Sequence, residues 1–223
     1  VKDHSVYVRF QAKTKTKDWR NTSILSWTTT PWTLPGNVAL AVNPKEDYVR
    51  VPDPDFRDHW LVLGYKSFQQ LLEKGVFPAE YSDLQKPNID VFKGREMLGI
   101  AYEPLFRIKQ LISKTSHRVL PADFVSMEEG TGVVHTAVMY GEDDFELGKR
   151  FKLPMHHTVD ENGNFTKDVP SWKGKFVKNA DESIAKNLQS RGLLFKEELY
   201  EHDYPFCWRC STPLLYYAHR SWF

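Results

Sequence analysis

The chain has 223 residues, of which 41% are hydrophobic and 26% charged, and its formal net charge is +1. This near-neutral balance excludes a protein that coats nucleic acid through bulk positive charge. The ordinary globular composition excludes disordered and collagen-like chains, and no apolar run approaches the ~18–20 residues that span a membrane. We therefore expect a globular domain, and the length is sufficient for a real hydrophobic core.

The first half of the chain predicts mainly β-strands. Apolar alternation and β-branched residues, interrupted by turns rich in Pro, Asp and Asn, predict strands over 6–10, 24–30, 38–42, 48–51 and 60–63. A short helix is predicted over 68–74, with Ser67 as its N-cap and Gly75 as its end.

The second half mixes strands and helices. The pattern predicts a strand over 132–135, a helix over 141–151, a hairpin turn over 160–164 and a helix over 179–191 that ends at Gly192. The fold class that follows is α/β (α+β), with a β-barrel-like core of short strands and peripheral helices. We expect a single domain over 1–223.

The first segment of chemical interest is 27–37, which reads Trp-Thr-Thr-Thr-Pro-Trp-Thr-Leu-Pro-Gly-Asn. Pro31 and Pro35 fix the backbone angle φ and remove two N–H donors, so the loop should be stiff. A stiff loop that carries four hydroxyls can orient a water or a polar substrate at little entropic cost. The alternative is a Thr-rich strand that ends at a Pro turn, since threonine is a good strand residue.

The second segment joins the glycine-rich strand 130–137, which contains His135, to an acidic helix start at Asp143 and Asp144. Glycines let the backbone approach a ligand closely, and the helix macrodipole favours ionised acids. An ionised carboxylate in a pocket is a natural partner for a substrate ammonium group. The alternatives are a pair of surface acids and a histidine with a purely structural role. As a phosphate loop the motif is weak, because it lacks the third glycine and the Lys-Ser/Thr ending.

The third segment is the Cys-Trp-Arg-Cys run that contains Cys207 and Cys210. A Cys-x-x-Cys turn supplies half of a tetrahedral zinc site, which His202 and His219 could complete, although neither has a standard finger spacing. A redox role is disfavoured because the pair does not open a helix after a strand. The alternative is two buried thiols. With only two cysteines, a disulfide scaffold is excluded and a reducing cytoplasm is the expected location.

Charge is uneven along the chain although the total is nearly neutral. The first 20 residues carry two acidic side chains and six basic ones, Lys2, Arg9, Lys13, Lys15, Lys17 and Arg20. Such a patch can hold a nucleic-acid backbone, and the alternative is a solvated face. The sequence begins without Met and stops at Trp222 and Phe223, so we expect the chain to be excised from a larger protein.

Three runs of sequence together resemble one known family. The 27–37 segment, Gly-Thr-Gly-Val-Val-His at 130–135 and Gly-Glu-Asp-Asp at 141–144 are similar to the editing domain inserted into isoleucyl-tRNA synthetase, a class I aminoacyl-tRNA synthetase. The resemblance covers essentially the whole chain, and it makes 200–223 the tail that leads back toward the synthetic domain. The related leucyl and valyl editing domains have an Arg where this chain has Thr30, so the isoleucyl type is the closer match.

One residue departs from the pattern of this family. Val138 stands where many members have a proline. The position lies in a predicted loop and carries no reactive group, so the departure concerns the geometry of the loop.

The resemblance implies a proofreading hydrolase rather than a ligase. The implied reaction is hydrolysis of the ester that joins valine to tRNA(Ile), with valyl-adenylate as a second candidate substrate, in a pocket that excludes isoleucine. The need arises because one methylene changes binding in a synthetic pocket by only about 1–3 kcal/mol, and selection of isoleucine over valine by isoleucyl-tRNA synthetases is the standard example of that limit. The implied partners are the 3′ end of tRNA(Ile) carrying valine and the rest of the synthetase, with no membrane, and we expect a monomer.

The resemblance also implies the residues of the site. Asp144 would bind the α-ammonium group of the misattached amino acid. The ester would be lined, and the attacking water positioned, by Thr28, Thr29 and Thr30. The pocket for the amino-acid side chain would be walled by Trp32, Thr33 and His135. Asn37 would help to hold the threonine loop. Because the chain offers no nucleophile–base pair, we expect direct attack by an oriented water.

No cofactor is expected for this hydrolysis. The resemblance makes Cys207 and Cys210 half of a zinc site whose other half lies outside this chain, with zinc as a structural ion of the intact synthetase. The rival hypothesis is a non-catalytic tRNA-binding or zinc-stabilised interaction module, which would depend on the basic N-terminal residues and the cysteine pair.

Overall fold

The computed structural model describes residues 1–13, 19–83, 89–201 and 203–219. The strands of the larger sheet, in spatial order, are β6 (Asp90–Lys93), β4 (Asp47–Pro52), β5 (Trp60–Gly64), β2 (Thr22–Thr28), β1 (Lys2–Gln11) and β9 (Leu194–Glu201). Those of the smaller sheet are β7 (Arg118–Pro121), β3 (Ala39–Val42) and β8 (Val133–Thr136). Neighbouring strands are antiparallel except in the pairs β2–β5 and β3–β7, which are parallel.

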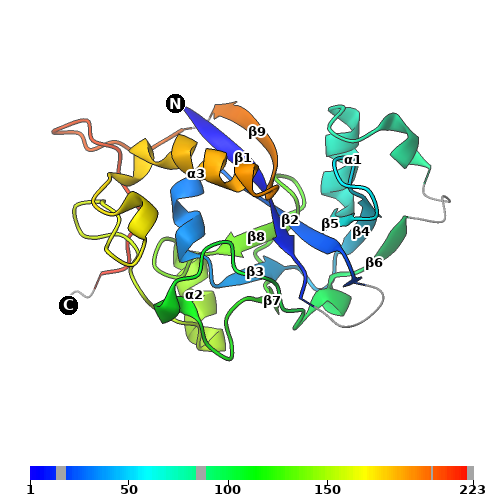
Figure 1. Cartoon of the computed structure of the whole chain (residues 1–223), viewed down its shortest axis with the longest axis horizontal. Helices are drawn as coiled ribbons and strands as arrows, with labels where there is room; N and C mark the ends of the chain where they lie inside the picture. The colour runs from blue at the N-terminus through cyan, green and yellow to red at the C-terminus, as the bar shows by residue number, and fades with distance from the viewer. Residues whose placement is uncertain (14–18, 84–88, 202, 220–223) are drawn as a thin grey trace.

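Helices lie around these sheets. The α-helices of the described residues are α1 (Tyr65–Glu73), α2 (Glu142–Phe151) and α3 (Asp181–Ser190). The 3₁₀-helices are η2 (Pro31–Gly36), η3 (Ala79–Ser82), η4 (Gly94–Met97), η5 (Lys109–Leu111), η6 (Pro170–Trp172) and η7 (Val177–Asn179). Figure 1 shows α1 beside β4 and β5 at one end of the molecule, α3 along β1 and β9, and α2 beside the smaller sheet. No described helix is long and apolar enough to cross a membrane.

The two sheets meet where β2 passes β8. Ser26 Oγ donates to the carbonyl oxygen of Val133 at 2.8 Å, and Gly64 N donates to that of Thr131 at 2.7 Å. These bonds join the sheets at a corner without forming a continuous ladder, so both sheets stay open over the described residues. The predicted α/β class is therefore correct, but the predicted barrel-like core is not a closed barrel.

Most elements expected from the sequence are present. The strands expected from residue 6 to residue 63 correspond to β1–β5, and the elements expected after residue 130 correspond to β8, α2 and α3. Ser67 is not an N-cap, because α1 begins at Tyr65 and the buried Ser67 hydroxyl donates to the carbonyl oxygen of Met127 at 3.3 Å. The strand expected over 24–30 ends at Thr28, where the chain turns toward η2.

Three strands were not expected from the sequence. β6 and β7 have four residues each, too short for a clear alternation, and β7 ends in a proline. β9 has the sequence Leu-Phe-Lys-Glu-Glu-Leu-Tyr-Glu, whose charges reflect its place at the exposed edge of the larger sheet. Edge strands are commonly charged, and that hides their apolar pattern.

The main core lies between β1, the smaller sheet and α3. Val6, Val8 and Phe10 of β1 point into this core, whereas Tyr7 points into a second cluster beneath α1. Trp32 of η2 belongs to the main core and is only 3% exposed. Because the core holds η2 by its own side chains, the segment that follows β2 is fixed in place by burial.

Candidate active site

The threonine loop, residues 28–37, runs from the end of β2 through η2. All six residues of η2 are buried, and Pro31 opens it at a position where a missing N–H costs nothing. Asn37 ends the turn by donating its backbone N–H to Leu34 O at 3.1 Å. β2 ends at Thr28 and Pro31 opens the turn, as the alternative of a Thr-rich strand that ends at a Pro turn expects, and the turn is buried throughout.

A chain of hydrogen bonds links the hydroxyls of this loop. Thr33 Oγ1 donates its proton to the carbonyl oxygen of Thr30 at 2.8 Å, because a carbonyl can only accept. Thr33 Oγ1 then accepts from Thr30 Oγ1 at 3.4 Å, and Thr30 Oγ1 accepts from Thr28 Oγ1 at 3.2 Å. The backbone N–H of Thr30 donates to Thr28 Oγ1 at 3.1 Å. With the bonds assigned in this direction, the protons of Thr28, Thr30 and Thr33 are committed, and Thr28 and Thr30 each keep one acceptor lone pair.

His135 extends this chain from β8. Its Nε2 lies 2.9 Å from Thr33 Oγ1, and because we assign the Thr33 proton to the Thr30 carbonyl, we assign the ring proton to Nε2 as the donor. Nδ1 is buried and has no hydrogen-bond partner within the described part of the chain. Burial lowers the pKa of His135 to about 4, so the ring is neutral at pH 7. In this tautomer Nε2 has no lone pair with which to take a proton from water.

Asp144 lies in the first turn of α2, close to the end of β8. Its Oδ2 accepts the backbone N–H of Ala137 at 3.0 Å, two residues beyond His135. Gly141 leaves room for this carboxylate, since a Cβ there would stand 3.2 Å from Oδ2. Burial raises the pKa of Asp144 to about 6, Ala137 N–H lowers it, and the exposed Asp143 raises it. Burial therefore outweighs the expected effect of the helix macrodipole, and Asp144 is still ionised at pH 7.

The glycines of the 130–137 segment serve internal packing. Gly130 and Gly132 both have φ of +67°, which favours glycine. A Cβ on Gly130 would stand 2.9 Å from the Trp27 ring, and one on Gly132 would stand 2.5 Å from Met127 Sδ. The close approach expected toward a ligand is, in this structure, an approach to neighbouring side chains.

Trp32 and Asn37 are both buried beneath the loop surface. The Trp32 ring packs edge-on against Tyr140 with 5.2 Å between centroids, and its Nε1 has no hydrogen-bond partner among the described residues. Asn37 donates from Nδ2 to Ala39 O at 2.9 Å and accepts the Tyr102 hydroxyl at 2.7 Å. Asn37 thus holds the end of the threonine loop, whereas Trp32 anchors its middle.

A cleft of ≈ 310 Å³ opens beside the loop. One side is formed by Trp27, Thr28 and Thr29, and the other by the turn 129–134. Thr28 belongs to both the cleft and the hydroxyl chain, so the cleft reaches the chain at that residue. Larger cavities of ≈ 470, ≈ 610 and ≈ 380 Å³ lie near Trp172, near His157 and near Gly163.

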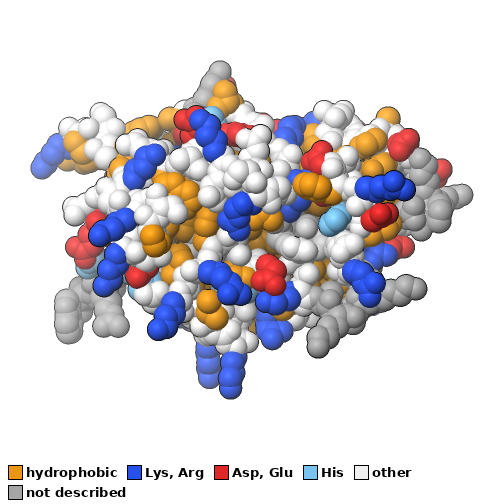
Figure 2. All heavy atoms as spheres, viewed as in Figure 1, with side chains coloured by type: hydrophobic (Ala, Val, Ile, Leu, Met, Phe, Trp, Pro, Cys, Tyr) orange, Lys and Arg blue, Asp and Glu red, His pale blue; other side chains and the backbone are white. Residues whose placement is uncertain are grey.

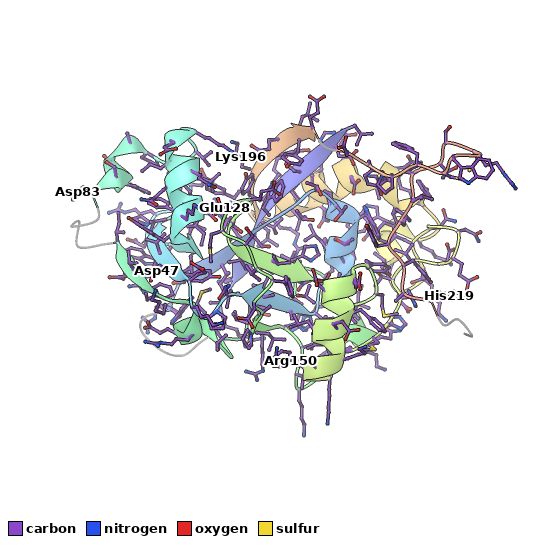
Figure 3. All side chains as sticks on the ribbon, turned by 180° about the vertical axis from the view of Figure 1, so that it is seen from behind. Asp47, Asp83, Glu128, Arg150, Lys196 and His219 are labelled. Atoms are coloured by element: carbon purple, nitrogen blue, oxygen red, sulfur yellow. The ribbon has the colours of Figure 1, made fainter. Side chains whose placement is uncertain are left out.

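The cysteine turn lies on the tail 203–219, away from the threonine loop. Ser211 N donates to Cys207 O at 2.8 Å, and Cys210 is exposed, which excludes two buried thiols. His202 lies outside the described residues, and His219 sits 3.5 Å from Glu161 at the far end of the tail (Figure 3). The described residues contain no group of three or more His, Cys, Asp or Glu that could hold a metal.

Of the six basic residues expected near the N-terminus, Arg9 and Lys13 are both paired with acids. Arg9 is 3% exposed and binds Asp53 through Nε at 2.8 Å and Nη2 at 2.9 Å, so the expectation for this residue is wrong. Lys13 pairs with Glu103 at 2.9 Å, while Lys15 and Lys17 lie outside the described residues. Figure 2 shows Lys and Arg side chains spread over its face of the molecule rather than gathered in one place.

One residue near the loop was not singled out from the sequence. Asp181, the first residue of α3, accepts the backbone N–H of Trp32 at 2.8 Å. The sequence predicted the helix and so placed an acid in its first turn, but 149 positions separate the two partners and no local pattern joins them.

The chain is similar over its whole length to a segment of known proteins. It is 45% identical over 223 residues to isoleucine–tRNA ligase of Clostridium novyi, covering 100% of this chain and 20% of that protein. It is also 45% identical over 222 residues to isoleucine–tRNA ligase 2 of Bacillus cereus, with the same coverage. The chain thus spans about a fifth of the length of the curated relatives it matches. No protein-family model matches it.

The fold is also known. The editing domain of the P. falciparum cytosolic leucyl-tRNA synthetase superposes with a TM-score of 0.60 at 14% sequence identity, covering 90% of this chain and 100% of that one. The chain therefore has the fold of an aminoacyl-tRNA synthetase editing domain. Within that class it corresponds to a segment of isoleucine–tRNA ligase, which confirms the resemblance carried by its motifs.

Proposed function

We propose that this chain hydrolyses the ester between valine and tRNA(Ile), with valyl-adenylate as a second substrate. The observation that carries the proposal is the hydrogen-bond chain from Thr28 through Thr30 and Thr33 to His135, together with the Asp144 carboxylate, which binds the backbone two residues beyond His135. Its occurrence in a chain that matches isoleucine–tRNA ligases supports this chemistry over a binding role.

Asp144 binds the substrate through charge. Its carboxylate is ionised at neutral pH, and the bond from Ala137 N–H occupies only one of its oxygens. The α-ammonium of an aminoacyl ester supplies the missing counter-charge for this half-buried group. The amino acid is thereby fixed by its ammonium end near the end of β8.

Thr28 and Thr30 position the attacking water. Because the proton of each hydroxyl is committed within the chain, each oxygen meets a water only as an acceptor. The water then points an O–H at a threonine and a lone pair away from it, toward the ester carbon. Its oxygen bonds to the carbonyl carbon, the bond from that carbon to the ribose oxygen breaks, and the ribose leaves as a hydroxyl. The proton lost by the water balances the one gained by the ribose.

Size selection is assigned to the side-chain wall of Thr33 and His135, with Trp32 behind it. Close-packed walls reject an extra methylene by overlap, which typically costs about 1–3 kcal/mol. The bond from Nε2 to Thr33 holds the imidazole in place, so the ring cannot relax away from a larger side chain. Since His135 is a neutral donor in the same hydroxyl chain, its role is steric and not that of a general base.

Zinc takes no part in this proposal for hydrolysis. Cys207 and Cys210 fit a half-site only, because the described residues add no third ligand. When bound in an intact synthetase, the ion would crosslink the tail to another segment. We further propose that residues 1–223 act as one editing domain whose partner is the charged 3′ end of tRNA(Ile).

The test is deacylation of charged tRNA(Ile) by the unaltered chain. Val-charged and Ile-charged RNA are each mixed with rising concentrations of the chain until the rate saturates. We expect rapid loss of valine and retention of isoleucine. Release of valine no faster than in buffer, at saturation, would contradict the proposal and favour the non-catalytic module.

A further inference from the structure

The backbone N–H groups at the start of η2, the turn that follows Thr30 and contains Thr33, need hydrogen-bond acceptors. The first N–H groups of a helix have no partner within it. In η2, Pro31 has no N–H, and Thr33 N donates to Thr30 O at 2.9 Å. The side chain of Thr30 does not cap the turn. Trp32 N–H is thus the donor of the first turn that must find an acceptor elsewhere.

That acceptor comes from a distant helix. Asp181 Oδ1 accepts Trp32 N–H at 2.8 Å, and the Asp181 residue is only 8% exposed. Burial raises the pKa of this carboxyl to about 7, while the Lys178 ammonium, itself 2.6 Å from Asp3 Oδ2, lowers it. The position at the N-terminus of α3 also favours the charged form through the helix dipole. The hydrogen bond from Trp32 N–H is the contact by which this buried carboxyl group reaches the threonine loop.

The position of Trp32 makes this bond relevant to the chemistry. Trp32 lies between the two residues whose hydroxyls are joined in the chain, Thr30 and Thr33. A shift of its backbone would change the 3.4 Å distance between those hydroxyls, which is already near the limit for a hydrogen bond. Misplacement by a fraction of an ångström matters most in the reaction step, where orientation sets the rate.

We propose that Asp181 is a positioning residue for hydrolysis, which aligns the Thr30 and Thr33 hydroxyls by fixing Trp32 N–H. The inference depends on the proposed function, because it assigns a reaction to those hydroxyls. Asp181 acts through the backbone of the loop and does not contact the substrate. Its loss should therefore slow the reaction step and leave substrate binding almost unchanged.

The test compares Asp181→Ala with Asp181→Asn, which keeps an oxygen acceptor but loses the charge. Single-turnover deacylation of Val-charged tRNA(Ile) is measured against the concentration of the chain. We expect Asp181→Ala to lower the saturating rate about tenfold or more with half-saturation changed by less than about twofold, and Asp181→Asn to recover most of the rate. Glu182→Ala, on the next and exposed position of the same helix, is the matched control and should keep the full rate.

Exchange of the Trp32 amide hydrogen provides a readout apart from catalysis. It should be slow in the unaltered chain and in Asp181→Asn, and fast in Asp181→Ala. If Asp181→Ala does not fold, Asp181→Ser replaces it, because a serine side chain is shorter than that of aspartate and does not reach Trp32 N–H.

Equal loss of rate in the Ala and Asn variants with an unchanged melting temperature would overturn the inference, as would a wild-type rate in Asp181→Ala. Absence of hydrolysis by the unaltered chain would instead contradict the proposed function.

Discussion

The threonine loop and the cysteine turn are both short motifs that stand out in the sequence, yet they differ in burial and in the segments that contact them. η2 is buried throughout and is held by Asp181 from α3, by His135 from β8 and by its packing on Tyr140. The cysteine turn is held by bonds within its own few residues, and Trp208 between the cysteines is 86% exposed.

The difference lies in how far distant parts of the fold support each motif. Two distant segments contact the threonine loop, through Asp181 and His135, and such support is what the proposed hydrolysis requires of a preorganised site. The cysteine turn shows no such support from distant segments within the described residues. Substitutions in the first region should therefore change hydrolysis, and those in the second should not.

The largest effect is expected from Asp144→Ala. Removing the carboxylate leaves the substrate ammonium without its partner in a partly buried place, which typically costs about 2–5 kcal/mol. Deacylation of Val-charged tRNA(Ile) should fall by orders of magnitude, with the circular dichroism spectrum unchanged. Asp143→Ala is the matched control on the adjacent, exposed position and should be much milder. Full activity in Asp144→Ala would remove Asp144 from the site.

A smaller loss is expected from Thr30→Val, which keeps the shape of the side chain and removes its hydroxyl. The variant interrupts the hydrogen-bond chain at its middle and removes one of the two acceptors for water. One hydrogen bond contributes about 0.5–1.5 kcal/mol, so the saturating rate should fall about three- to tenfold. Thr115→Val, a threonine on an exposed loop, is the control. An unchanged rate in Thr30→Val would show that this hydroxyl does not position the water.

Acid should affect the same region in a predictable direction. Because the pKa of Asp144 is raised to about 6, the anionic form that binds the ammonium is lost as pH falls through 6, and kcat/KM should drop about tenfold per unit below it.

The same groups change the stability of the fold with pH. Protonation of Asp144 favours the folded state, since its folded pKa lies above its unfolded value of 3.8. His135 acts in the opposite direction, because its folded pKa of about 4 lies below its unfolded value of 6.5. The stability that the neutral ring contributes is therefore lost as pH falls from 6.5 toward 4. Melting temperatures measured at each pH separate a loss of folded protein from a loss of activity. A flat profile of kcat/KM from pH 7 to 5 would contradict the assignment of Asp144 to the ammonium.

The smallest effect is expected in the cysteine turn. Replacing Cys207 and Cys210 with serine, or adding a chelator, should leave the deacylation rate of this chain unchanged, because in the proposed mechanism hydroxyls orient the water. Elemental analysis checks the metal directly. Stoichiometric zinc together with a lost deacylation rate in the double variant would contradict this prediction and show that the cysteine turn is needed for hydrolysis.

The sequence predicted the strands that carry the site and, through the resemblance, which residues to examine. Local patterns sufficed for β2, β8 and α2 because their apolar periodicity and acidic helix start are visible within ten residues. The bond from Trp32 to Asp181 was not predictable, because it joins segments that only the folded core brings together. The same reason explains Arg9, which reads as a surface base but is buried against Asp53.

The central claim is that a preorganised hydroxyl chain hydrolyses the valine ester while a fixed imidazole rejects isoleucine. The most direct measurement is deacylation of both Val-charged and Ile-charged tRNA(Ile) by His135→Ala, whose side chain no longer donates to Thr33. We expect substantial hydrolysis of the valine ester together with new hydrolysis of the isoleucine ester. A parallel collapse of both rates, with the fold intact, would contradict the steric role of His135 and identify it as part of the proton-transfer machinery instead.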